Sequence, residues 1–495
     1  MKWAAGTKVI ESLRILLAIC IRFGIVSNSF ASDLLAPLLK KPNSDPTLPN
    51  NYRPVVISTT FSKILEIHIL KECNEHEFDD LQFGFVQNRG TAMAAALTHD
   101  VIEYMKSRGS PVYACSLDAE GAFDGIPHSI LFKKALGVIP DTYWRIMVYW
   151  YSGLTVQIKW GDGLSHSIKV LKGTRQGGLS SPFLFNLFYQ DMIQDLSNMK
   201  VGICINDATY NVFCYADDIL LCSASVSGLQ KLINKANKYI VEHGLRFNPT
   251  KTHCITFGKC KTPNKRWFLG GAELKQTESI MYLGVALSDS QKAHVDARIV
   301  ATRKAFFALK SAGVFANEAD VNSRIHIFNA AIRPVILYGL QSIYQNKSSH
   351  IKAEKFHAKL LKSTLGLKRY CVNTPLLKAM KVLRVEESVE MQTLQLLRSM
   401  ILSKSRSHHF YGFLLGQHLN GTATCKTDLL SRSQIICNKY SISLMMMLCN
   451  EKYIREKKIF NQFREQDGLV ETVRYLTDNL SNESRHLINS LLSPF

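Results

Sequence analysis

The chain has 495 residues, of which 46% are hydrophobic and 20% are charged. This composition is typical of a folded globular protein and excludes a disordered or low-complexity chain. The formal net charge is +20, and residues 291–495 carry 30 Lys and Arg against 15 Asp and Glu. Such an excess indicates either a polyanionic partner or a solvated basic surface.

The 12 cysteines form no CxxC pair, so the sequence lacks the spacing of a zinc finger. Thiols scattered through apolar segments are typical of a reducing, intracellular compartment. The basic stretch 259–266 favours either a nuclear-localisation signal or a surface hairpin. The apolar run 15–26 is too short to span a bilayer, so we expect neither a membrane partner nor a signal peptide.

In chain order, residues 1–35 are predicted to be helical, and the prolines within 41–54 predict an extended loop after that helix. Apolar residues recur at helical spacing over 62–70 and over 91–105. The first β-type run follows at 112–117.

Strands and helices are mixed over the next part of the chain. Further strands are predicted at 155–160, 167–171, 211–214, 219–222, 253–257 and 281–287. Helices are predicted at 129–136, 141–150, 182–196 and 226–243. Because the elements do not alternate strictly, the sequence favours an α+β fold over a doubly wound sheet. Strand signals nearly vanish after residue 290, which predicts a mainly helical remainder.

Three carboxylates lie at the ends of predicted strands. Asp118 directly follows one strand, and Asp217 and Asp218 lie between two apolar runs. If these strands are neighbours, the three side chains meet at one edge of a sheet. Carboxylate oxygens suit Mg²⁺, and two ions about 3.5–4 Å apart serve an in-line phosphoryl displacement. An Asp-Asp pair on its own is more often an ordinary turn.

Seven strings then occur in the order found in reverse transcriptases of non-LTR (LINE-type) retrotransposons, which the chain resembles. They are NYRPV at 51–55, QFGF at 82–85 with RGT at 89–91, LDAEGAFD at 117–124, GTRQGG at 173–178, YADD at 215–218, GLRFNPTKT at 244–252 and YLG at 282–284. The resemblance implies an RNA-directed DNA polymerase with a right-hand fold. It would add dNTPs to a DNA primer on an RNA template, assisted by two Mg²⁺ ions, with Mn²⁺ as the alternative ion.

The same resemblance divides the chain into four parts. Residues 1–35 would be an N-terminal helical extension, and 36–290 the fingers and the palm with its antiparallel sheet. Residues 291–400 would form a helical, basic thumb. Residues 401–495 would be a helical C-terminal extension of unknown role.

The family's metal ligands correspond to Asp118, Asp217 and Asp218. Phe123 takes the place of an aromatic gate that excludes the ribonucleotide 2′-OH, although a plain core position is the alternative. Lys251 takes the place of a general acid for the leaving pyrophosphate, the alternative being an ordinary surface lysine.

Further roles concern the nucleotide and the primer. Gln176 and Gly177 would contact the incoming nucleotide, and the guanidinium groups of Arg53 and Arg89 suit its triphosphate. The primer grip would be formed by Tyr282, Leu283 and Gly284.

A basic helix is expected in the thumb, because its lysines follow 3-4-3 spacing and so share one face. These nucleic-acid-binding candidates are Lys352, Lys355, Lys359 and Lys362. The face would lie on the template–primer backbone, or it is a generic solvated surface.

The strings of an upstream endonuclease and of a C-terminal zinc knuckle are not found, which predicts a truncated element copy without its own endonuclease. Two other hypotheses stay open. One is a catalytically inactive, nucleic-acid-binding relic of such an element. The other is an RNA-templated RNA polymerase, which Phe123 disfavours. The sequence does not predict the oligomeric state.

Overall fold

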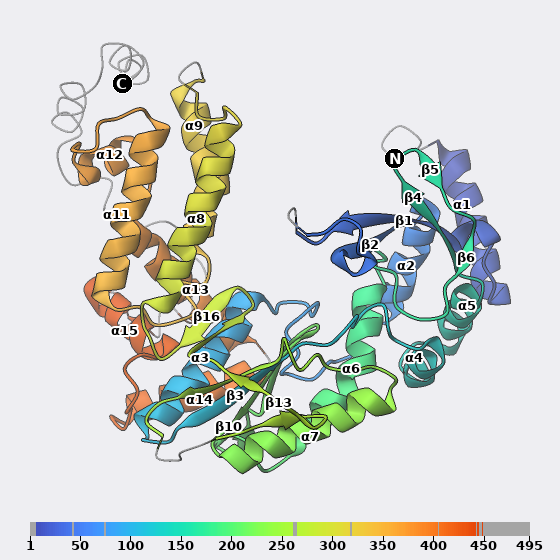
Figure 1. Cartoon of the computed structure of the whole chain (residues 1–495), viewed down its shortest axis with the longest axis horizontal. Helices are drawn as coiled ribbons and strands as arrows, with labels where there is room; N and C mark the ends of the chain where they lie inside the picture. Colours follow the sequence, from blue (N-terminus) through green and yellow to red (C-terminus); the bar gives the residue numbers. More distant parts are fainter. Residues whose placement is uncertain are drawn as a thin grey trace.

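The computed structural model describes residues 6–41, 44–73, 76–260, 265–316, 319–403 and 405–441, together with 443, 444 and 448. Figure 1 shows two arms that rise from a common base. One arm carries strands β1, β2 and β4 with helices α1 and α2, and the other carries the long helices α8 and α11. The base contains strands β3 and β10 with helices α3, α6 and α7. This arrangement is the α+β, right-hand polymerase architecture expected from the sequence.

The sheet in the base has the strand order β14-β11-β3-β10-β9. Its strands are β3 (Val112–Leu117), β9 (Val212–Tyr215), β10 (Asp218–Ser223), β11 (His253–Phe257) and the short β14 (Lys275–Gln276). The first four pair antiparallel, and β14 pairs parallel with β11. Strands β3, β9 and β10 are buried at nearly every position because helices pack on the sheet.

Those covering helices begin where the sequence provides a start signal. They are α3 (Thr91–Ser107), α6 (Ser181–Asn198) and α7 (Val226–Glu242). Pro182 occupies the first turn of α6, where its missing N–H costs nothing. The Ser225 side chain accepts a hydrogen bond from Gly228 N at 3.0 Å and so caps α7. All three helices lie close to their predicted ranges, as do the antiparallel strands.

The sheet in the first arm has the order β2-β1-β4-β5, with β6 also paired to β4. Its strands are β1 (Ser32–Leu39), β2 (Tyr52–Ile57), β4 (Thr155–Trp160), β5 (Gly163–Leu164) and β6 (Ile168–Lys169). Around it lie the helices α1 (Thr7–Phe23), α2 (Thr60–Glu72), α4 (His128–Ala135) and α5 (Asp141–Ser152), with 3₁₀ turns at Asn28–Phe30 and Pro49–Asn51.

The predicted helix over 1–35 is wrong in its second half. Gly24 has a left-handed conformation (φ 69°), which ends α1 at Phe23. Ser32 then begins β1, which pairs antiparallel with β2 and parallel with β4. The parallel pairing joins segments more than 100 residues apart, and the local pattern did not predict it.

The second arm begins with a hairpin where the sequence predicted one strand over 281–287. Strands β15 (Ser279–Tyr282) and β16 (Val285–Ser288) pair antiparallel. The turn between them has positive φ at both Leu283 (51°) and Gly284 (74°), as a two-residue type I′ hairpin turn requires. The remaining short hairpins are β7 (Cys204–Ile205) with β8 (Ala208–Thr209), and β12 (Phe268–Leu269) with β13 (Ala272–Glu273).

Helices make up the rest of this arm and the segment that follows it. They are α8 (Ala293–Ser311), α9 (Val321–Ile327), a π-helical turn (Phe328–Ile332), α10 (Arg333–Leu337), α11 (Lys347–Thr364), α12 (Asn373–Ala379), α13 (Val385–Leu402), α14 (Arg406–Leu419) and α15 (Leu429–Lys439). A separate apolar core holds the arm together around Phe306, Phe328 and Leu361. The predicted helical character after residue 290 is therefore confirmed as far as α15.

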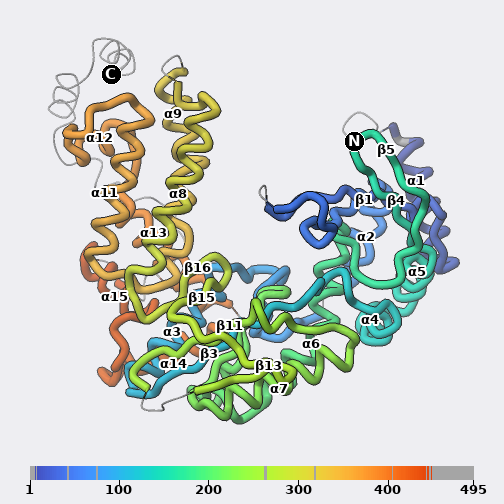
Figure 2. The backbone as a smooth tube through the Cα atoms, viewed as in Figure 1, coloured from blue at the N-terminus to red at the C-terminus, as the bar shows by residue number. Residues whose placement is uncertain are grey.

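The chain returns to the base after forming this arm. Figure 2 shows α14 beside α3, far from the arm's tip. The fully buried Asp100 of α3 accepts hydrogen bonds from the Tyr411 hydroxyl at 2.8 Å and from Leu429 N at 2.7 Å. Residues 449–495, and part of the basic stretch 259–266, lie outside the described residues. Within the described part of the chain, none of the helices has the length and apolar character needed to cross a membrane.

Candidate active site

The strand pairing brings Asp118 to the Asp-Asp turn. Leu117 pairs with Ile219, and Asp218 pairs with Tyr215 across the β9–β10 hairpin. Asp118 therefore follows β3 at the edge where the hairpin turns. Its own backbone oxygen accepts a hydrogen bond from Asn248 N at 2.8 Å, which ties the end of β3 to the next loop.

The turn itself rests on the segment 82–85. Gln82 Oε1 accepts hydrogen bonds from Ala216 N at 3.1 Å and from Gly84 N at 2.9 Å. A Cβ atom added to Gly84 would lie 2.4 Å from Ala216 N, which is too close for any side chain. Ala216 has φ 55° and is buried, so the turn needs this support. The Gln82 side chain and Gly84 therefore support the Asp-Asp turn, a role that the sequence did not predict.

The carboxylates repel one another. Partial burial and the charges of Asp217 and Asp118 raise the pKa of Asp218 to about 6. Burial also raises the pKa of Asp217, with a further rise from Asp118. Lys251 Nζ lies 3.6 Å from Asp118 Oδ2 and offsets part of the charge. Such a cluster favours a bound cation, because a cation relieves the repulsion.

Asp118 and Asp217 line a cavity of about 1680 Å³, whereas Asp218 does not. Their oxygens are the donors that Mg²⁺ prefers, so the pair fits a divalent ion. Among the described residues, however, no three His, Cys, Asp or Glu side chains are close enough to hold a metal ion together. Of the three expected ligands, Asp118 and Asp217 therefore line the cavity, and the metal-binding role of all three stays a prediction.

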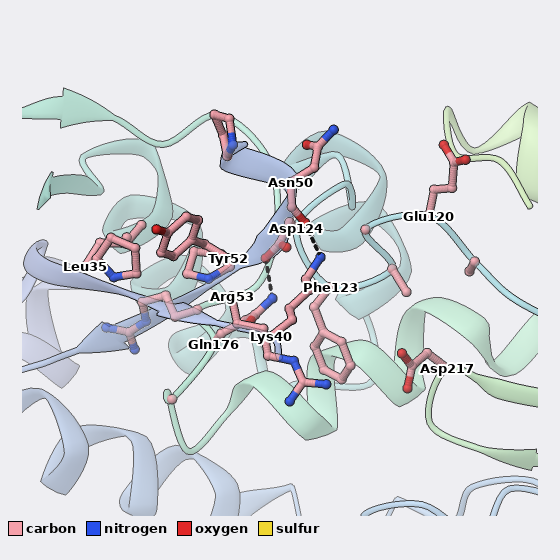
Figure 3. Close-up of a pocket in the computed structure, with 18 of the residues that line it drawn as sticks. Leu35, Lys40, Asn50, Tyr52, Arg53, Glu120, Phe123, Asp124, Gln176 and Asp217 are labelled. Atoms are coloured by element: carbon pink, nitrogen blue, oxygen red, sulfur yellow. Dashed lines mark hydrogen bonds between the residues drawn. The ribbon is translucent and has the colours of Figure 1, made fainter. Parts of the chain in front are cut away.

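Phe123 also lines the cavity. Its half-buried ring stacks on Phe185 with centroids 4.1 Å apart and meets Phe85 edge-on at 6.4 Å. Figure 3 shows this ring between Asp217 on one side and Gln176 with Asp124 on the other. Phe123 is therefore both a packed residue and an exposed wall of the cavity, so the gate and core interpretations are compatible.

Gln176 and Gly177 also line the cavity. Gln176 Nε2 donates to Asp124 Oδ1 at 2.6 Å, and Gln176 O accepts from Val56 N at 2.7 Å. Gly177 has φ 119°, and a Cβ there would lie 2.5 Å from Val56 O. The glycine is required by this approach to β2, a reason that differs from the expected approach to a nucleotide.

The two arginines expected at a triphosphate behave differently. Arg53 is exposed on β2, lines the cavity and opposes the rise in the pKa of Asp217. Arg89 is largely buried and does not line the cavity. Its guanidinium donates to Asp79 O at 2.6 Å and to Gln82 O at 2.7 Å, and it pairs with Asp80. In this structure Arg89 holds the segment that supports the Asp-Asp turn, and its expected contact with the triphosphate stays a prediction.

The hairpin expected to grip the primer contacts both the base and the helices of the second arm. The Tyr282 side chain is fully buried against the base, where burial, Cys214 and Asp218 raise its pKa. Leu283 O accepts a hydrogen bond from the Tyr338 hydroxyl at 2.8 Å, and a Cβ on Gly284 would lie 3.1 Å from the Tyr338 ring. The turn is thereby fixed against the second arm.

The predicted lysine face on α11 is wrong at one end. Lys362 is 8% exposed, and its Nζ donates to Arg369 O at 3.1 Å. Lys352 is exposed but pairs with Asp296 at 2.6 Å. Lys355 and Lys359 are exposed on the helix. The basic face is therefore shorter than the spacing predicted, because the helix buries its last turn.

A model of the family "Reverse transcriptase (RNA-dependent DNA polymerase)" matches residues 39–287, about half of the chain. The chain belongs to this family. Its relatives include polymerases of non-LTR elements, as the motifs indicated. The RNA-directed DNA polymerase from mobile element jockey of Drosophila melanogaster is 24% identical over 371 residues, which cover 71% of this chain and 40% of that protein.

A second relative is the retrovirus-related Pol polyprotein from type-2 retrotransposable element R2DM of Drosophila melanogaster. It is 27% identical over 252 residues, which cover 48% of this chain and 23% of that protein. The chain thus spans less than half the length of these relatives. Among solved structures, telomerase from Candida tropicalis with a fragment of telomeric RNA has a TM-score of 0.38 and 12% identity, covering 95% of this chain and 65% of that chain.

Proposed function

We propose that this chain is an RNA-directed DNA polymerase that adds dNTPs to the 3′-OH of a DNA primer on an RNA template. The observation that carries the proposal is the meeting of Asp118 and Asp217 in one cavity with Phe123, Gln176 and Arg53. The family match and the relatives' names support the same activity.

Asp118 and Asp217 are the residues that would hold divalent ions, Mg²⁺ by preference, with Asp218 adding negative charge from the neighbouring position. When bound, two such ions would stabilise the attacking and leaving oxygens of an in-line displacement. The raised pKa values of Asp217 and Asp218 describe the ion-free carboxylates, and a bound cation would favour their charged forms.

The other side chains bind and orient the substrate. Arg53 offers a guanidinium fork to the phosphate oxygens, and Gln176 offers an amide held by Asp124. The Phe123 ring forms the wall against which the sugar would rest. Lys251, beside Asp118, places a cation near the charge that develops on the pyrophosphate.

The three structural parts suit a template–primer lying across the base. In this proposal the first arm, with β1, β2 and β4, serves as fingers (Figure 1). The helical second arm serves as the thumb, and the exposed Lys355 and Lys359 on α11 would contact nucleic-acid phosphates. The hairpin turn at Leu283 and Gly284 would support the primer end.

The test is primer extension on an RNA template with Mg²⁺, comparing wild type with Asp118→Asn and Asp217→Asn. Both variants should lose extension while binding primer–template as the wild type does. Asp195→Asn is the control, because Asp195 is an exposed residue paired with Lys235 on the helices behind the sheet. Nucleic-acid binding without any Mg²⁺-dependent extension by the wild type would instead identify an inactive relic.

A further inference from the structure

The loop that carries Gln176 and Gly177 is held in place by a buried ion pair. Arg175 is 3% exposed and Glu66, on α2, is fully buried. Arg175 Nη2 donates to Glu66 Oε1 at 2.5 Å. The guanidinium carbon of Arg175 lies 4.1 Å from the centroid of the Trp150 ring, so the aromatic face covers the cation.

Glu66 also binds the loop on the far side of Gly177. Its Oε1 accepts from the Ser180 hydroxyl at 2.6 Å and from Ser180 N at 3.3 Å, and its Oε2 accepts from Leu179 N at 3.1 Å. One carboxylate therefore holds the residue before Gln176 and the two residues that lead into α6. The Gln176–Gly177 turn lies between these two attachments.

Other contacts fix the same loop from the palm and the fingers. Thr174 N donates to Phe123 O at 2.8 Å, and Val56 N donates to Gln176 O at 2.7 Å. Asp33, on β1, brings a second carboxylate 3.5 Å from Arg175 Nη1, but it makes no hydrogen bond there. Glu66 is thus the partner that satisfies the guanidinium and the loop together.

Buried ion pairs seldom add net stability, since apolar side chains of the same volume would cost less desolvation. The buried pair of Glu66 and Arg175 is therefore better explained by the loop geometry that it fixes than by a gain in stability. We propose that Glu66 and Arg175 are positioning residues that set the height of Gln176 and Gly177 above the cavity and so determine the affinity for the incoming dNTP. This inference rests on the proposed polymerase function.

Steady-state kinetics with a single dNTP distinguish positioning from a general structural role. Glu66→Gln keeps the size of the side chain but removes its charge and places an amide against the donors. The KM for dNTP should rise about tenfold or more, which is the loss of one charge-assisted hydrogen bond, while kcat changes less than about threefold. The Kd for primer–template should stay at the wild-type value.

A merely structural role would lower the active fraction, and therefore the apparent kcat, at unchanged KM. That result would overturn the inference. Glu103→Gln is the matched control, because Glu103 is a partly buried carboxylate that does not line the cavity. Its Oε1 atom pairs with Lys106 Nζ at 2.6 Å. It should leave both KM and kcat at wild-type values.

Ser180→Ala provides a second, milder test in case the Glu66→Gln variant does not fold. It removes one donor to Glu66 and leaves the ion pair intact, so the KM for dNTP should rise about threefold. An unchanged KM in Ser180→Ala would refute the proposal. Failure of the wild type to extend a primer would overturn the polymerase function and this inference with it, whereas an active wild type with normal KM in both variants would overturn the inference alone.

Discussion

Substitution of Gly84 by alanine should damage catalysis without touching a cavity-lining residue. The added Cβ would lie 2.4 Å from Ala216 N and 2.8 Å from Tyr215 C, both backbone atoms of the Asp-Asp turn. A normal contact between such atoms is about 3.5 Å or more, so the turn must move by roughly 1 Å. Neither neighbour is the flexible end of a side chain that could rotate away.

Two consequences follow from that movement. The hydrogen bonds from Ala216 N and Gly84 N to Gln82 Oε1 would both stretch, at a cost of about 1–3 kcal/mol in the free energy of unfolding. Asp217, the next residue after Ala216, would move with the turn. Misplacement of a reacting group by about 1 Å costs on the order of 100-fold in rate, and we expect that loss in kcat for extension.

Single-nucleotide primer extension and thermal unfolding measure the two effects separately. Gly90→Ala is the control, because a Cβ on Gly90 meets no atom within 4 Å and its φ is −153°. Gly90→Ala should retain activity, with a melting temperature close to that of the wild type. A Gly84→Ala variant that extends primers at the wild-type rate would show that the turn does not depend on this close approach.

Phe123→Ala should reduce the preference for dNTP over rNTP by about tenfold or more, measured as a ratio of kcat/KM values, and an unchanged ratio would remove the gate role. The pKa of Asp218 is raised to about 6, so this carboxylate binds a proton more tightly in the folded, ion-free protein than in the unfolded chain. The free energy of unfolding should therefore fall as pH rises from about 4 to about 6. Asp218→Asn should therefore raise the melting temperature near pH 7 but not near pH 4, and equal effects at both would contradict this. Lys355→Ala with Lys359→Ala should weaken primer–template binding and reduce its salt slope by about two, whereas Lys362→Ala should lower the melting temperature and leave the slope unchanged.

The elements that the sequence predicted well are those with strong local signals. Strand β3 (Val112–Leu117) and the strands around the Asp-Asp pair are continuous apolar runs that stop at polar residues, so their ends are visible in the residues. The β9–β10 hairpin is local, but β3 lies far earlier in the chain, so the meeting of Asp118 with Asp217 could be expected only on the condition that β3 and β10 are neighbours, which their antiparallel pairing fulfils.

The parts that the sequence missed depend on distant partners. Glu66 and Arg175 are 109 residues apart, and nothing in the residues near either one indicates that they meet. Arg89 belongs to a string shared with the family, yet its guanidinium donates to the carbonyl groups of Asp79 and Gln82, which lie 10 and 7 residues earlier. Lys362 has the spacing of an exposed residue, but the neighbouring helices decide which face of α11 is covered.

Asp100 and Glu66 are two of the buried carboxylates among the described residues, and both accept hydrogen bonds from segments distant in sequence. Asp100 receives the Tyr411 hydroxyl and Leu429 N, and Glu66 receives a guanidinium, a hydroxyl and two backbone N–H groups. A buried carboxylate without such donors would be costly, so each arrangement is stable only when segments distant in sequence are in place. Asp100 thereby fixes the returning helices α14 and α15 against α3, and Glu66 fixes the Gln176–Gly177 loop against α2. Loss of a single donor leaves the charge undersatisfied, which is why conservative changes at these positions should cost more than changes on the exposed basic helix.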